Sequence, residues 1–197
     1  MFVFAPLCIL SGVCVLYMSH ASRETTVVQE EYAFVQKVDL ESYVGKWYQV
    51  YGDALDATFE GISPSCVEAE YGLKNDGNIS VKNTEINRRG SVQSIDGVAF
   101  YGENAVVGTG ELSVSFYGVP GSMPVGAYWI IKLGPIVDEY YDYAVVSDDK
   151  QVSLFVLVRD VGRYDEKYDE DVLQWLEETG FTKEYNKPIR TDQEGCM

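Results

Sequence analysis

The sequence has very little histidine: the only one in 197 residues is His20, at the end of an apolar N-terminal stretch. Once that stretch is removed, the chain has no histidine. Ser-His-Asp and Cys-His catalysis both need an imidazole base and are therefore excluded. The commonest metal-binding side chain is also missing. The sequence thus predicts a protein that is not an enzyme, with no catalytic residue, metal site or cofactor.

Basic residues are also scarce. Lys and Arg together number 15 against 31 Asp and Glu, which gives a formal net charge of −16. A surface of this kind repels nucleic acid and anionic membranes. We therefore expect neither nucleic acid nor strong anionic-membrane binding among its partners.

The N-terminal residues have the pattern of a secretory signal. Met1–Met18 contains no charged side chain, and the small residues of Ser19-His20-Ala21 follow it. A signal peptide over residues 1–21 and a secreted, extracellular protein are predicted. No Lys or Arg precedes the apolar stretch, so an uncleaved membrane anchor is the alternative. Residues 22–37 are expected to be a flexible arm and residues 38–197 a single domain.

Cysteine is limited to four residues, and Cys8 and Cys14 lie in the predicted signal. Cys66 and Cys196 remain. An even pair of cysteines in an oxidising compartment is typical of a disulfide. We expect Cys66 and Cys196 to be bonded, which would tie an early strand to the C-terminal tail.

Apolar and polar residues alternate with period two through most of the chain, which is the pattern of half-buried strands. Eight such segments at short spacing predict an all-β fold, an eight-stranded antiparallel up-and-down barrel. The segments are 47–51, 66–73, 79–85, 91–101, 111–118, 127–133, 142–147 and 153–159.

One C-terminal α-helix is predicted. Val172, Trp175, Leu176 and Thr179 follow helical spacing, acidic residues occupy the first turn, and Gly180 ends the segment. The apolar stripe should pack against the outside of the barrel, with Trp175 as a packing residue.

A Gly-x-Trp sequence opens the first strand at Gly45-Lys46-Trp47, and Arg159 ends the last one. This combination resembles the lipocalin family. The resemblance implies that Arg159 covers Trp47 across the closed floor of the barrel in a cation–π contact. Gly45 allows the close backbone approach at the turn. Gly45, Trp47 and Arg159 are therefore the predicted structural floor.

Within that family, the segments 38–48, 66–71 and 77–83 are most similar to apolipoprotein D and the bacterial outer-membrane lipocalins. The tail Thr191-Asp192-Gln193 before Cys196 is also similar, and it implies the same pairing with Cys66. One departure concerns the floor motif, usually Thr-Asp-Tyr, which here reads Tyr141-Asp142-Tyr143.

The interior of an eight-stranded barrel is just wide enough to be filled by side chains or to hold one small ligand. Alternation predicts that Leu112, Val114 and Phe116, and likewise Trp129, Ile131 and Leu133, face inward. Asn83 and Glu85 should lie high on the inner face, either wetted at a flared rim or anchoring a polar head group. The resemblance implies pocket roles for Tyr71, Asn83, Glu85 and Trp129. The predicted ligand-binding residues are Tyr71, Asn83, Glu85, Val114, Phe116, Trp129 and Ile131.

The function predicted from these features is binding and transport of a small hydrophobic ligand such as a fatty acid, lysolipid, sterol or retinoid. The alternatives are binding of a bilin or carotenoid pigment, a lipid-modifying enzyme with Cys66 as nucleophile, and a purely structural barrel with a filled interior. The segment 118–126 is a lid, a docking patch for a lipid particle or an ordinary mobile loop, and the sequence identifies no receptor. Asn78-Ile79-Ser80 has the form of an N-glycosylation site.

Overall fold

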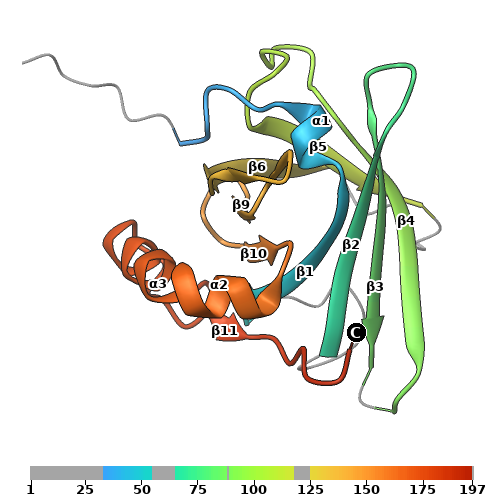
Figure 1. Ribbon diagram of the computed structural model, residues 1–197. Coiled ribbons are helices and arrows are strands. Elements are labelled where there is room, and N and C mark those ends of the chain that lie inside the picture. Colours follow the sequence, from blue (N-terminus) through green and yellow to red (C-terminus); the bar gives the residue numbers. More distant parts are fainter. Residues whose placement is uncertain (1–32, 55–64, 88, 118–124, 197) are drawn as a thin grey trace, which may run out of the picture. The chain divides into compact units, whose positions relative to one another are not determined.

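Eight antiparallel strands form a closed barrel (Figure 1). The structure is a computed structural model that describes residues 33–54, 65–87, 89–117 and 125–196. Each strand is hydrogen-bonded to its neighbour in the order β10-β9-β6-β5-β4-β3-β2-β1, and β10 pairs with β1 to close the barrel. The predicted fold class is therefore confirmed. The strands are β1 (Gly45–Gly52), β2 (Ser65–Leu73), β3 (Ile79–Ile86), β4 (Val92–Phe100), β5 (Glu111–Phe116), β6 (Gly126–Leu133), β9 (Tyr143–Ser147) and β10 (Leu154–Val158).

Because successive side chains of a strand point to opposite faces, the wall contributes to two separate apolar cores. The inner core includes Trp47, Ala69, Tyr71, Val81, Leu112, Ile130, Ala144, Val146 and Leu157. The outer core includes Val50, Tyr143, Val145, Val156 and Val158 from the strands and Tyr164, Val172, Leu176 and Phe181 from the C-terminal region.

Two helices cover the outer core. The predicted helix is present as α3 (Asp169–Glu178), and its Val172 and Leu176 are buried against the barrel wall as expected. Gly180 follows it with a φ of +99°, a conformation that suits glycine after a helix end. The sequence did not predict α2 (Val161–Lys167), whose first turn is capped by the Asp160 side chain accepting from the Arg163 N–H.

Short elements occur at the closed end of the barrel. The helix α1 (Leu40–Tyr43) precedes β1, and a hairpin of β7 (Ile136–Val137) and β8 (Tyr140–Tyr141) lies between β6 and β9. The Asp39 N–H donates to the Tyr141 hydroxyl at 3.1 Å, which joins α1 to the hairpin. These contacts seal the end at which β1 begins.

Residues 33–37, the described part of the predicted N-terminal arm, contact the barrel, and the flexibility of the arm over residues 22–37 stays a prediction. Val35 donates to the Ile130 carbonyl at 2.9 Å and accepts from Gly110 at 2.7 Å, and Phe34 packs edge-on against Trp129. The predicted signal peptide, residues 1–21, lies outside the described residues. In the described ranges, no helix is both long enough and apolar enough to cross a membrane.

The C-terminal tail is part of the barrel wall. Pairing of β1 with β2 stops at Tyr48 and Glu68, and beyond that point β11 (Ile189–Arg190) pairs with β1. The Gln193 side-chain amide donates to the carbonyls of Gln49 and Val67 at 2.9 and 2.8 Å. The tail thus fills a split between the two strands, and Figure 1 shows the C-terminus beside β2. The predicted disulfide is present and joins Cys66 to Cys196 across 130 residues.

Candidate functional site: a cavity inside the barrel

The floor of the barrel is organised around Arg159. Its guanidinium carbon lies 3.6 Å from the centroid of the Trp47 ring, so the predicted cation–π contact is confirmed. Burial lowers the pKa of Arg159 to about 10, and the side chain therefore remains charged at neutral pH. Its N–H groups donate to the carbonyls of Ser42, Tyr43, Val44, Lys46 and Tyr141.

The neighbours of Arg159 explain two other features of the floor. Gly45 has a φ of +100°, and a Cβ there would meet the Arg159 Nη1 at 3.3 Å, so glycine fits both the conformation and the space. In the Tyr-Asp-Tyr motif, Asp142 is buried and forms a two-pronged pair with Arg163, with Nε at 2.9 Å from Oδ2. The sequence did not predict this pair, because Arg163 belongs to the unpredicted α2.

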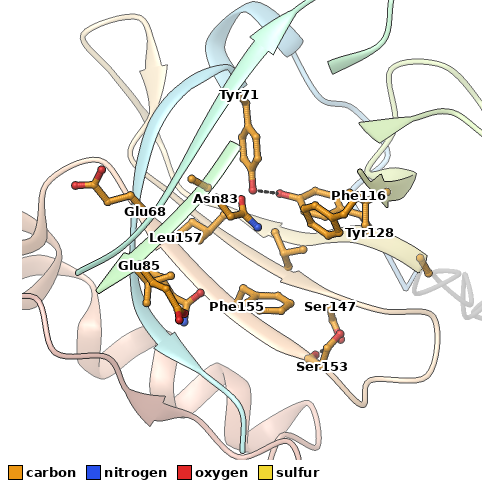
Figure 2. A pocket seen from close by; sticks show the side chains of 16 residues that line it. Glu68, Tyr71, Asn83, Glu85, Phe116, Tyr128, Ser147, Ser153, Phe155 and Leu157 are labelled. Atoms are coloured by element: carbon orange, nitrogen blue, oxygen red, sulfur yellow. Dashed lines mark hydrogen bonds between the residues drawn. The ribbon is translucent and has the colours of Figure 1, made fainter. Parts of the chain in front are cut away.

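Above the floor lies a cavity of about 140 Å³. Because a water molecule occupies about 30 Å³ in the liquid, the cavity has room for about five waters. Aromatic and aliphatic side chains form most of its wall, with a small number of polar groups, the composition typical of sites for hydrophobic small molecules (Figure 2). The lining residues are Gln49, Val67, Glu68, Ala69, Tyr71, Asn83, Glu85, Val114, Phe116, Ala127, Tyr128, Val146, Ser147, Ser153, Phe155 and Leu157.

Two buried tyrosines, Tyr43 and Tyr71, and the partly buried Tyr128 are linked by their hydroxyl groups at the end of the cavity nearest the floor. The Tyr128 hydroxyl donates to that of Tyr71 at 3.0 Å and lies 2.7 Å from that of Tyr43. The Tyr71 and Tyr43 rings are stacked, with centroids 5.7 Å apart. Burial raises the pKa of Tyr71 to about 12 and the pKa values of Tyr43 and Tyr128 well above 10. All three are neutral phenols at physiological pH.

These raised pKa values predict a loss of stability in alkali. Folding favours the neutral phenol, so its contribution is complete below the unfolded pKa of about 10 and disappears as the pH rises toward 12. Two pKa units at Tyr71 correspond to about 2–3 kcal/mol. Chemical denaturation between these pH values should show this loss, and Tyr71→Phe should reduce it. Ionisation of all tyrosines near pH 10 with the barrel still folded would contradict the prediction.

Further polar groups lie toward the end where β9 finishes and β10 begins. Asn83 and Glu85 project into the cavity from β3, as Figure 2 shows, and the Ser147 hydroxyl donates to the Ser153 carbonyl at 2.7 Å. Glu68 also borders the cavity, but its carboxylate points away and pairs with Lys46 at 2.9 Å (Figure 2). No Lys or Arg is among the described residues that line the cavity.

The structure brings together five of the seven predicted ligand-binding residues and separates two from them. Tyr71, Asn83, Glu85, Val114 and Phe116 all line the cavity.

The prediction that Trp129 and Ile131 face the interior is wrong. Trp129 packs against Phe34, and Ile131 packs against the outer core. The inward residues of β6 are instead Tyr128 and Ile130, and Leu133, which follows an irregularity between Ile130 and Lys132, packs against the inner core as predicted. Both faces of this strand are apolar, because one lines the barrel and the other is covered, so alternation by itself does not identify the inner face.

The pairing of Cys66 bears on the enzyme alternative. Its sulfur is bonded to Cys196, so it is not available as the free thiolate that a nucleophile requires. The predicted N-glycosylation site, Asn78, lies in the turn between β2 and β3, where its N–H donates to the Asp76 carboxylate at 3.1 Å. Glycosylation of Asn78 stays a prediction.

Comparison with known proteins identifies the class. The chain matches the Lipocalin-like domain family over residues 38–189, and it belongs to that family. It is 33% identical to apolipoprotein D of Bos taurus over 111 residues, which is 56% of this chain and 51% of that protein. It is 37% identical to outer membrane lipoprotein Blc of Vibrio cholerae over 128 residues, 64% of this chain and 67% of that protein. The chain thus spans about half the length of the apolipoprotein D relatives it matches.

Among solved structures, the cockroach allergen Per a 4 has a TM-score of 0.53 at 16% identity, covering 83% of this chain and 92% of its own. This likeness concerns the fold. The family resemblance predicted from the Gly-x-Trp and Arg positions is confirmed.

Proposed function

We propose that the protein is a secreted carrier that binds one small hydrophobic molecule inside its barrel, of the class of fatty acids, lysolipids, sterols or retinoids. The observation that carries this proposal is the cavity above the Arg159–Trp47 floor. A filled interior would have indicated a structural barrel.

The balance of apolar burial against the cost of association favours modest affinity. A chain that buries about ten methylenes gains about 8 kcal/mol, whereas association costs roughly 4 kcal/mol or more. Few polar groups line the wall, so shape and apolar area dominate recognition. The difference of about 4 kcal/mol corresponds to a dissociation constant of about 1 mM, and hydrogen bonds between a ligand head group and the polar groups of the wall should tighten binding toward the micromolar range.

Binding of the uncharged fluorescent probe N-phenyl-1-naphthylamine tests this function. The wild-type protein should enhance its fluorescence with a micromolar dissociation constant. Val114→Trp places an indole in the cavity and should weaken binding at least tenfold, because Val114 lines the wall.

Ser115→Trp is the matched control, since alternation on β5 directs residue 115 to the opposite face. It should bind the probe as the wild type does. Equal affinity of the two variants, each shown to be folded by thermal unfolding, would place the binding site outside the barrel and contradict the proposal.

A further inference from the structure

The linked hydroxyl groups of Tyr43, Tyr71 and Tyr128 leave one hydrogen without an acceptor in the described part of the chain. Each hydroxyl has one hydrogen, and two hydrogen bonds join the three groups. Tyr128 donates to Tyr71, so the bond between Tyr43 and Tyr128 must use the hydrogen of Tyr43. The hydrogen of Tyr71 then has no acceptor among the described residues. Because Tyr71 lines the cavity, a donor is directed at whatever occupies it.

Asn83 supplies the complementary group. Its side-chain oxygen Oδ1 is buried and has no hydrogen-bond partner in the described structure. On the paired strands, Tyr71 is opposite Val81 and Asn83 is opposite Ala69. Tyr71 and Asn83 are therefore diagonal neighbours on one face of the sheet, with Cα atoms about 7–8 Å apart. A buried acceptor without a partner is costly. A ligand group that donates to Asn83 would remove that cost.

One donor and one acceptor in the same cavity match a group that both accepts and donates. An alcohol hydroxyl does both, whereas an ether only accepts, an ammonium only donates and an ionised carboxylate only accepts. A carboxylate would also enter a wall that has, among its described residues, no Lys or Arg to pair with it, and an ionised group without a partner is costly to bury.

We propose that this cavity, if it is the ligand site argued above, selects amphiphiles with an uncharged hydroxyl head group, which accepts from the Tyr71 hydroxyl and donates to Asn83 Oδ1. Carboxylates of the same skeleton bind more weakly. Within the class of hydrophobic ligands, head-group chemistry thus favours alcohols over free fatty acids. The raised pKa of Tyr71, due chiefly to burial, keeps its hydroxyl a donor at neutral pH.

A matched series of ten-carbon ligands tests this proposal by displacement of N-phenyl-1-naphthylamine from the wild-type protein. The series is decan-1-ol, decyl methyl ether, decylamine and decanoate at neutral pH. Decan-1-ol should bind at least tenfold more tightly than decanoate and several-fold more tightly than the ether and the amine. Decanoate or decylamine binding as tightly as the alcohol would overturn the proposal. If no member displaces a bound probe, or the probe itself does not bind, the carrier function fails instead.

Two variants assign the effect to the named groups. Tyr71→Phe and Asn83→Leu should each weaken decan-1-ol binding about five- to tenfold. Asn83→Leu should leave the ether within twofold of its wild-type affinity, because the ether has no hydrogen to donate. Tyr117→Phe, which removes a hydroxyl from an exposed side chain, is the matched control. It should change neither the affinity for decan-1-ol nor the affinity for the ether. An unchanged preference for the alcohol over the ether in Asn83→Leu would overturn the assignment to Asn83.

Discussion

Replacing Arg159 by alanine should lower the free energy of unfolding by about 3–5 kcal/mol. The substitution removes the cation–π contact with Trp47, worth ~0.5–2 kcal/mol. It also removes the donors to the carbonyls of Val44 and Lys46, at 2.8 and 2.6 Å. Hydrogen bonds from a charged donor contribute about 1.5–3 kcal/mol each, and carbonyls left unpaired in the floor add to the loss. Urea denaturation of the purified variant measures the change.

Two further variants show whether the loss belongs to the guanidinium itself. Arg159→Lys keeps the charge but offers donors from a single nitrogen, so it cannot reach all five carbonyls that the three guanidinium nitrogens contact. Its stability should lie between those of wild type and Arg159→Ala. Arg89→Ala removes an exposed arginine and should change stability by no more than about 0.5 kcal/mol. Equal stability of Arg159→Ala and Arg89→Ala would contradict the role given to the floor.

Removing the disulfide should have an effect of similar size. The bond between Cys66 and Cys196 closes a loop with a sequence separation of 130, for which chain entropy predicts about 5 kcal/mol and practice usually gives somewhat less. We expect Cys66→Ala/Cys196→Ala to lose about 3–5 kcal/mol in the free energy of unfolding. The double substitution avoids leaving a reactive thiol.

The tail should also separate locally from the wall in this variant. The Thr191 N–H donates to the Val50 carbonyl at 2.9 Å, and hydrogen exchange at this amide should accelerate more than exchange within β9 and β10. Gln193→Ala keeps the disulfide and removes only the two side-chain hydrogen bonds to the carbonyls of Gln49 and Val67. Its free energy of unfolding should therefore fall by about 1–3 kcal/mol. A disulfide-free variant within 1 kcal/mol of wild type would show that the tail is held by its other contacts.

The features of the fold that the sequence predicted are those set by local pattern. Period-two alternation located all eight barrel strands to within a few residues, and helical spacing located α3. The disulfide followed from counting, because only Cys66 and Cys196 remain after the predicted signal. The floor contact between Trp47 and Arg159 followed from the family resemblance.

The features that the sequence did not predict depend on contacts between segments that are far apart in the chain. Tyr43 and Tyr128 are 85 residues apart, and only the closed barrel brings their hydroxyls together. Alternation on β6 defined two faces without showing which one is internal, because the arm and the outer core cover the other face. The tail acquired its place in the wall because β1 and β2 diverge after Tyr48, and no local pattern records that divergence.

The most direct test of the cavity as a ligand site is a crystal structure of the protein with 10-bromodecan-1-ol, using the anomalous signal of bromine. We expect a bromine peak inside the barrel and density for the hydroxyl between Tyr71 and Asn83. An interior closed by collapsed side chains, with bromine only on the outer surface, would contradict it.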